Sequence, residues 1–265
     1  MQYLFLSDID GTLLNADTPL VREVVVAARA YTAQGGLLSL CTGRSLPAAV
    51  AVAETLGVNA PSILYGGAAI YDFRKKQYLD SHPFCGDVMQ AVRAVLAASD
   101  EISMQVCTKE NIYVLRRNRR LQEKGADEEN RGPLSSADDV RGEILKVVMC
   151  CDEPERLEAC RRFFPPEYCR FAFASRTFVD VVAAGFGKGD AVKRLSKLLD
   201  IPLSRFFAAG DSMTDLPMLQ VAGLSFAPEN AAEAVKKAAK YVVPSVCCGG
   251  MEKAFLLAAE WMRGQ

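Results

Sequence analysis

Three groups of polar residues in this sequence have the types and spacing that chemistry on a charged ligand requires. They are Asp8-Ile9-Asp10-Gly11-Thr12, Thr42-Gly43-Arg44 and Gly210-Asp211-Ser212-Met213-Thr214-Asp215. Each group directly follows a short apolar run of the kind that forms a buried strand. Open parallel sheets hold their ligands beyond the carboxyl ends of the strands, so the three groups are predicted to meet at one edge of a sheet.

The four carboxylates in these groups, those of Asp8, Asp10, Asp211 and Asp215, indicate a bound cation. At one sheet edge they would repel one another unless a positive charge lay among them, and hard oxygen ligands favour Mg²⁺. Asp8-x-Asp10-Gly could also form a solvated turn or a calcium loop. The calcium loop is excluded because its twelfth position is Pro19 rather than Glu and because a strand precedes it. The two further groups at strand ends favour a functional site over a solvated turn.

Lys188 can bring a fixed positive charge to such a site. It lies in Gly185-Phe186-Gly187-Lys188-Gly189, just before a predicted helix. This segment is not a Walker loop, because Gly189 stands where Ser or Thr is required. Taken alone, Lys188 would be an ordinary surface lysine. Its place before a helix also allows it to balance the carboxylates and a phosphate dianion.

The elements that must position these residues differ between the ends and the middle of the chain. The outer thirds alternate apolar runs with helical patterns, which predicts parallel βα units. Strands are expected there at residues 3–7, 37–41 and 205–209, and helices at 19–34, 46–56, 190–199, 213–221, 231–239 and 250–262. The middle reads as α+β, with helices at 87–97 and 155–164 and strands at 103–107, 112–115, 144–150, 170–174 and 178–182. Phe255 and Trp261, both on the last helix, are expected in the core.

This alternation predicts an α/β protein with a Rossmann-like parallel sheet as its core and an inserted α+β domain. Residues 1–80 and 186–265 are expected to form the discontinuous core domain, and residues 81–185 the insertion. The glycines at 185 and 187 suit a hinge. An insertion on such a hinge can close over the site and exclude water.

Composition narrows the classes of partner. The 31 basic and 32 acidic residues nearly cancel, so no global field favours nucleic acid, and the basic run Arg116–Arg120 is short enough to be a solvated face. No apolar stretch approaches the roughly 18 residues that span a membrane, and Tyr3–Leu6 is too short for a signal-peptide core. We therefore expect a cytoplasmic protein. Nothing in the sequence indicates an oligomeric state.

The cysteines and the single histidine argue against a zinc site. Nine cysteines are present without a C-x-x-C pair, so reduced and mostly buried thiols are expected. His82, next to Pro83, is expected to be a loop residue rather than a catalyst.

Taken together, these motifs resemble those of the haloacid dehalogenase (HAD) superfamily along the whole chain. The opening D-x-D-G-T, the Thr-Gly-Arg, the lysine before a helix and the late Gly-Asp-x-x-x-Asp occur in the family's order. The position and content of the insertion resemble the large, C2B-type cap of the Cof-like hydrolase branch, placed between the second and third motifs. The resemblance implies a Mg²⁺-dependent phosphatase of a small phosphorylated metabolite, such as a sugar phosphate, a nucleotide or pyridoxal phosphate.

The resemblance also implies roles for individual residues. Asp8 would be the nucleophile that forms an aspartyl-phosphate, and Asp10 the general acid and then base, with its backbone carbonyl on the metal. Thr42 would hydrogen-bond a phosphoryl oxygen, Lys188 would offset the charge on Asp8 and the phosphoryl group, and Asp211 would ligate Mg²⁺.

Four further positions are expected to support the site or contact substrate. Asp215 would either orient a metal-bound water or steady Lys188, and Arg44, beside Gly43, would either contact substrate or form a structural pair. Asn230 in Pro228-Glu229-Asn230-Ala231 matches a family position near the site.

Two departures from the family pattern each replace an asparagine. Thr214 stands where Gly-Asp-x-x-Asn-Asp has Asn, and Gly66 stands where Asn-Gly-Ala is common. Neither touches the expected nucleophile, acid/base or lysine, so activity is expected with an altered substrate fit.

Two rival functions remain open at this point. One is a phosphotransferase or phosphomutase with the same chemistry, and the other is a noncatalytic, metal-binding regulatory protein. The position of the insertion favours hydrolysis over the first, because mutases of the family usually carry a small helical cap at an earlier insertion point. The complete set of Asp8, Asp10, Thr42, Lys188 and Asp211 argues against the second.

Overall fold

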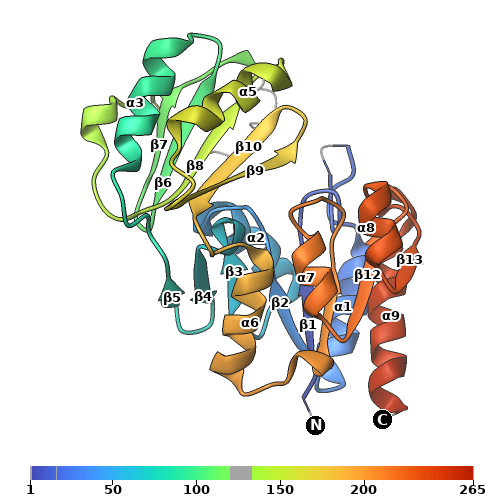
Figure 1. Ribbon diagram of the computed structural model, residues 1–265. Coiled ribbons are helices and arrows are strands. Elements are labelled where there is room, and N and C mark those ends of the chain that lie inside the picture. Colours follow the sequence, from blue (N-terminus) through green and yellow to red (C-terminus); the bar gives the residue numbers. More distant parts are fainter. Residues whose placement is uncertain (1, 16, 120–132, 265) are drawn as a thin grey trace. The chain divides into compact units, whose positions relative to one another are not determined.

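A computed structural model describes residues 2–15, 17–119 and 133–264 (Figure 1). Arg120, at the end of the basic run, lies outside these residues. The chain forms two compact units, one from the residues up to Asp80 together with those from Lys188 onward, and one from Ser81–Gly187. Within the described residues, no helix has both the length and the apolar character needed to cross a membrane.

The first unit is built on a sheet of five parallel strands in the order β13-β12-β11-β1-β2. The strands are β1 (Leu4–Ser7), β2 (Leu37–Leu40), β11 (Phe206–Ala209), β12 (Leu224–Pro228) and β13 (Tyr241–Val243). Strand β1 pairs with two neighbours, and its last residue, Ser7, lies opposite both Leu40 of β2 and Ala209 of β11. The carboxyl ends of β1, β2 and β11 therefore meet at one edge, and the predicted parallel-sheet core is confirmed.

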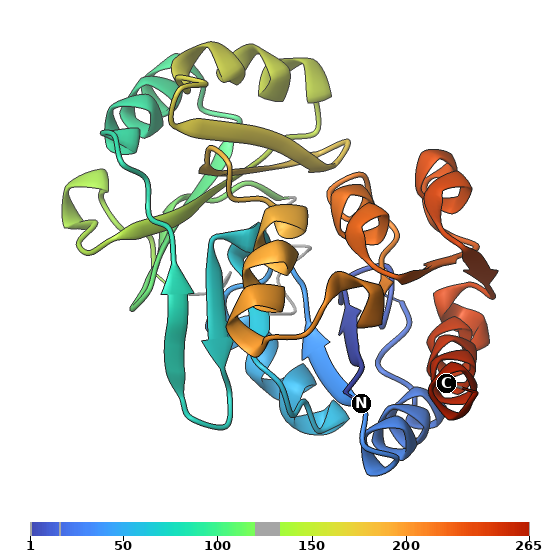
Figure 2. The ribbon, with the colours of Figure 1, turned by 60° about the horizontal axis from the view of Figure 1, so that its bottom comes forward.

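The two faces of this sheet follow the alternation of side chains along β1. Leu4 and Leu6 point to one face, where they join the apolar cluster of α6 (Lys188–Leu199) and α7 (Leu216–Val221). Phe5 points to the other face, beneath α1 (Arg22–Ala33) and α9 (Gly250–Arg263), which lie side by side in Figures 1 and 2. The remaining helices of the unit are α2 (Leu46–Leu56) and α8 (Glu233–Ala238).

Several bounds differ from the sequence-based expectation for local reasons. Helix α1 begins at Arg22 rather than residue 19, because Val21 is extended. Helix α7 begins at Leu216 rather than residue 213, because the preceding residues form a turn. Trp261 is 38% exposed and not in the core, whereas Phe255 is fully buried. The two side chains are six residues apart, which places them on different sides of a helix with 3.6 residues per turn.

A small three-stranded sheet was not predicted. It consists of β3 (Ser62–Leu64), β4 (Ala69–Asp72) and β5 (Gln77–Ser81), in that order. β3 has only three residues and β5 is partly exposed, so neither has the buried apolar run that signals a strand. Strands β12 and β13 were missed as well.

The second unit is an antiparallel five-stranded sheet in the order β7-β6-β8-β10-β9, with helices on one face (Figure 1). Its elements are α3 (Val88–Ala98), β6 (Ser103–Thr108), β7 (Ile112–Arg116), β8 (Ile144–Cys150), α5 (Pro154–Cys160), β9 (Cys169–Ser175) and β10 (Phe178–Ala183). Alternate residues point away from the helices, among them Gln105, Lys146 and Asp180. Lys146 Nζ lies 2.9 Å from Asp180 Oδ1 on this face.

We predict that the aromatic cluster around Phe5 carries much of the stability of the first unit. The Phe5 ring is fully buried, with ring centroids 4.5 Å from Phe255 and 5.7 Å from Phe226. Phe5→Leu should lower the free energy of unfolding by about 1.5 kcal/mol, because it leaves a partly unfilled space. Urea denaturation monitored by circular dichroism measures this change. The exposed Leu256→Ala on α9 is the control and should change stability by no more than about 0.5 kcal/mol. Equal effects of the two substitutions would contradict the prediction.

Candidate active site

The polar residues that follow β1, β2 and β11 lie at one edge of the parallel sheet, as the sequence predicted. Asp8 continues β1, and its backbone N–H donates to the Ala209 carbonyl of β11 at 2.9 Å. Thr42 follows β2, and Asp211 follows β11 after one glycine. Lys188 is the first residue of α6 rather than the residue before it.

Lys188 links two of these carboxylates inside the protein. Its Nζ donates to Asp8 Oδ1 at 2.9 Å and to Asp215 Oδ1 at 2.5 Å. All three residues are at least 95% buried. Burial disfavours the charged lysine, but the negative charges of Asp215 and Asp8 outweigh it and raise the pKa of Lys188. The lysine is therefore a permanent positive charge at the sheet edge.

Asp215 is held by the loop that contains it. Its Oδ2 accepts hydrogen bonds from the backbone N–H of Asp211 at 3.2 Å and of Ser212 at 2.9 Å, and from the Ser212 hydroxyl at 2.7 Å. With its other oxygen on Lys188, Asp215 is placed for the second of its two expected roles, that of steadying the lysine.

Three carboxylates form a group that could hold a metal ion. Asp8, Asp211 and Asp215 each offer an oxygen within 4.8 Å of the others. Burial and the charge of Asp215 raise the pKa of Asp8 well above its ordinary value, and the same two causes raise that of Asp211 to about 6. One lysine thus leaves the group short of positive charge, and a hard divalent cation fits an all-oxygen donor set of this kind.

The loop after β1 is shaped around Asp211. The Thr12 hydroxyl donates to Asp211 Oδ1 at 2.7 Å. Gly11 has φ of +83°, and a side chain there would place its Cβ 2.3 Å from Asp211 Oδ2, so only glycine fits. The Asn230 amide donates to the Gly11 carbonyl at 2.7 Å, which places Asn230 beside the site as expected.

The side chain of Asp10 is not part of the cluster formed by Asp8, Asp211 and Asp215. Its two oxygens accept hydrogen bonds from Arg44 Nη2 at 2.8 Å and Nε at 2.9 Å, a bidentate pair that links the loops after β1 and β2. Arg44 therefore forms the structural pair that was one of its two expected roles. The Asp10 side chain is 48% exposed.

The loop after β2 is anchored by hydrogen bonds, and among the described residues none accepts the hydroxyl hydrogen of Thr42. Thr42 Oγ1 accepts the Arg44 backbone N–H at 3.1 Å, across Gly43, and the Thr42 carbonyl accepts the N–H of Gly66 at 3.0 Å. Gly66 has φ of +68°, a conformation open to glycine and tolerated by asparagine.

Two residues of the site were given no role from the sequence. Thr12 holds Asp211, and Ser212 holds Asp215. Both lie inside the quoted motifs, next to or near the carboxylates. Their hydroxyl groups were the available signal, because buried carboxylates require donors.

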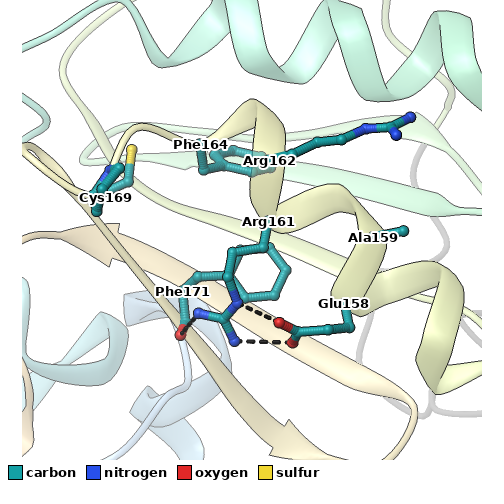
Figure 3. A pocket seen from close by; sticks show the side chains of 8 residues that line it. Glu158, Ala159, Arg161, Arg162, Phe164, Cys169 and Phe171 are labelled. Atoms are coloured by element: carbon teal, nitrogen blue, oxygen red, sulfur yellow. Dashed lines mark hydrogen bonds and ion pairs between the residues drawn. The ribbon is translucent and has the colours of Figure 1, made fainter.

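A separate hollow lies in the Ser81–Gly187 unit, between α5 and β9 (Figure 3). Its floor is mostly apolar, with Phe164 and Phe171 among its lining residues. Arg161 is engaged by both oxygens of Glu158 and by the Phe171 carbonyl. The residues that line the hollow include no nucleophile paired with a base. The cluster of Asp8, Asp211 and Asp215 is therefore the candidate active site.

Comparison with known proteins places the chain in a family. A family model described as haloacid dehalogenase-like hydrolase matches residues 5–255. The chain therefore belongs to the haloacid dehalogenase-like hydrolases, and the predicted Cof-like branch with a large inserted domain is supported by its relatives.

Three similar proteins illustrate the relationship. The Bacillus subtilis phosphatase YwpJ is 28% identical over 265 residues, covering 89% of this chain and 92% of that protein. The B. subtilis 5-amino-6-(5-phospho-D-ribitylamino)uracil phosphatase YcsE is 26% identical over 257 residues, covering 93% and 92%. A solved structure of a HAD subclass IIB sugar phosphatase, BT4131, superposes with a TM-score of 0.83 at 22% identity, covering 96% and 98%. The last likeness concerns the fold alone.

The raised pKa of Asp211 predicts how the metal-free protein responds to pH. Between the ordinary carboxyl pKa of about 4 and the folded value of about 6, the folded chain keeps a proton that the unfolded chain has lost. Stability must therefore fall as pH rises through this window. Asp211→Asn removes this loss, so the variant should gain about 2 kcal/mol over the native chain between pH 4 and 7.5.

Urea denaturation in the presence of a chelator at several pH values measures this difference. The exposed Asp17→Asn is the control and should follow the native curve. A difference between Asp211→Asn and the native chain that does not change with pH would contradict the prediction.

Proposed function

We propose that this HAD-family phosphatase is a Mg²⁺-dependent enzyme that hydrolyses a small phosphorylated metabolite, most simply a sugar phosphate, through an aspartyl-phosphate on Asp8. The observation that carries the proposal is the buried Lys188 Nζ, 2.9 Å from Asp8 Oδ1 and bound also to Asp215. A cation fixed beside a buried carboxylate suits attack on an anionic substrate, since it offsets the charge of both groups.

In the first step, an Asp8 oxygen attacks phosphorus and the bond from phosphorus to the ester oxygen breaks. The leaving oxygen takes a proton from Asp10, and the Thr42 hydroxyl donates to a phosphoryl oxygen. Lys188 stabilises the charge that accumulates between Asp8 and the phosphoryl group. Magnesium, held by Asp8, Asp211 and the Asp10 carbonyl, would supply further screening of this charge.

In the second step, Asp10 takes a proton from a water molecule that attacks the aspartyl-phosphate. The bond from phosphorus to Asp8 breaks, and inorganic phosphate leaves with Asp8 regenerated. The bidentate contact with Arg44 orients the Asp10 side chain between the two steps.

The Ser81–Gly187 unit is proposed to select the substrate. The face of its sheet opposite the helices carries Gln105 and the Lys146–Asp180 pair. Such polar groups can hydrogen-bond the hydroxyls of a sugar phosphate. Similarity to a protein named as a 5-amino-6-(5-phospho-D-ribitylamino)uracil phosphatase supports a polyhydroxylated substrate.

Asp8→Asn should abolish phosphate release, with kcat reduced at least about 1,000-fold, because the amide keeps the shape but is no longer a nucleophile. Inorganic phosphate release from an aryl phosphate and a panel of sugar phosphates, with and without Mg²⁺, measures this. Asp17→Asn is the matched control and should keep native activity. Isomerised sugar phosphate without free phosphate would indicate a mutase, and a native chain inert across the panel would indicate a noncatalytic protein.

Arg44→Lys should lower kcat about 10-fold or more with little change in KM. Lysine keeps the charge but cannot form the bidentate contact that orients Asp10, and small misplacements of a catalytic group are costly. Arg29→Lys, on the surface of the same unit where Arg29 donates to the Thr55 carbonyl, is the control. A loss confined to KM would instead assign Arg44 to substrate binding.

A further inference from the structure

Two adjacent cysteines form an exposed dithiol on the unit that carries the catalytic residues. Cys247 and Cys248 lie in the short 3₁₀ helix η6 (Val246–Cys248), just before α9, with their Sγ atoms 3.6 Å apart. Six other cysteines are buried, as expected for most of them, and the third exposed one, Cys85, lies in the other unit. No residue of the proposed phosphatase mechanism uses this dithiol.

The separation of the two sulfur atoms suits a shared cation. A tetrahedral metal with metal–sulfur bonds of about 2.3 Å holds two sulfurs about 3.8 Å apart, close to the observed distance. A disulfide fits less well. A disulfide requires sulfur atoms about 2 Å apart, and its two Cα atoms usually lie at least about 4.4 Å apart. The Cα atoms of adjacent residues lie only about 3.8 Å apart.

A neighbouring hydroxyl group favours the ligand form of Cys247. The Ser245 hydroxyl lies 2.9 Å from Cys247 Sγ. This hydrogen bond and the contact with Cys248 lower the pKa of the Cys247 thiol. The thiolate is the form that binds metals.

We propose that Cys247 and Cys248, against the expectation from cysteine spacing that no zinc site is present, form a chelating site for a thiophilic divalent cation such as zinc or cadmium, distinct from the Asp8, Asp211 and Asp215 cluster. Each thiol loses one proton as its sulfur bonds the cation, so binding releases two protons and changes no oxidation state. Soft thiolate ligands separate this site chemically from the oxygen ligands of Asp8, Asp211 and Asp215.

The segment that carries the dithiol is connected to the catalytic loop through the side chain of Asn230. The Val246 N–H donates to Asn230 Oδ1 at 2.9 Å, and the Asn230 amide donates to the Gly11 carbonyl at 2.7 Å. A cation on Cys247 therefore binds a segment that is tied to the loop between Asp10 and Thr12. Binding itself can be tested without measuring activity, so the site stands or falls independently of the proposed function.

The test is a titration of the reduced full-length protein with Cd²⁺ in excess Mg²⁺, followed by the ultraviolet charge-transfer absorbance of cadmium thiolates. We expect one cation per chain for the native protein. Cys247→Ser and Cys248→Ser should each bind about 100-fold more weakly, because the chelate is lost. Cys85→Ser is the matched control and should titrate like the native chain. Circular dichroism of each variant checks that it is folded.

Three outcomes would overturn the site. Native absorbance in both serine variants would place the cation elsewhere, and its loss in Cys85→Ser would make that cysteine a ligand. One cation for two chains, with a dimer in light scattering, would mean that the thiols bridge two copies instead of chelating within one.

Mass spectrometry of the protein treated with phenylarsine oxide, a reagent for paired thiols, is an independent test. A single adduct on the native chain that is absent from both serine variants supports the dithiol, and its persistence in either variant opposes it.

Discussion

The site depends on one buried ion bridge, in which Lys188 contacts both Asp8 and Asp215. Removing a lysine from water is costly unless opposite charges surround it, and here two carboxylates contact the same Nζ. In the sequence, Lys188 is 180 residues from Asp8 and 27 residues from Asp215, so the bridge joins distant parts of the chain. It requires α6 to begin close to α7, and Gly189 permits this, since a Cβ there would lie 2.7 Å from Pro217. Helix packing and charge balance are therefore fixed together.

The same bridge leaves the site with more negative than positive charge, which a cation could balance. Burial and the charge of Asp215 raise the pKa values of Asp8 and Asp211, and the one lysine does not offset these two causes. A phosphate dianion would add to this negative charge. The parallel sheet makes the imbalance unavoidable, because β1 and β11 pair residue by residue and bring their following loops to one edge. The fold thus gathers three carboxylates that could hold a metal ion.

Much of this arrangement could be predicted because it depends on local pattern. The carboxylates follow recognisable buried strands, and α2 has the bounds that its residue pattern predicts. The Asp10–Arg44 pair was left open, since no sequence rule tells which of several anions an arginine will contact. The short strand β3 has too few residues for a periodic signal, and it depends on its pairing with β4. Tertiary contacts decide these features.

Gly66 and Thr214 stand where the family pattern has asparagine, and the structure shows how the site accommodates each residue. Gly66 has φ of +68°, in the left-handed region, which glycine and asparagine both adopt. The hydrogen bond from the Gly66 N–H to the Thr42 carbonyl is therefore compatible with either residue at this position. At Thr214, the hydroxyl lies 2.8 Å from the Ser212 hydroxyl, which in turn donates to Asp215. Threonine therefore still takes part in the hydrogen bonding that steadies Asp215. Neither exchange adds or removes a charge, and the balance around Lys188 is unchanged.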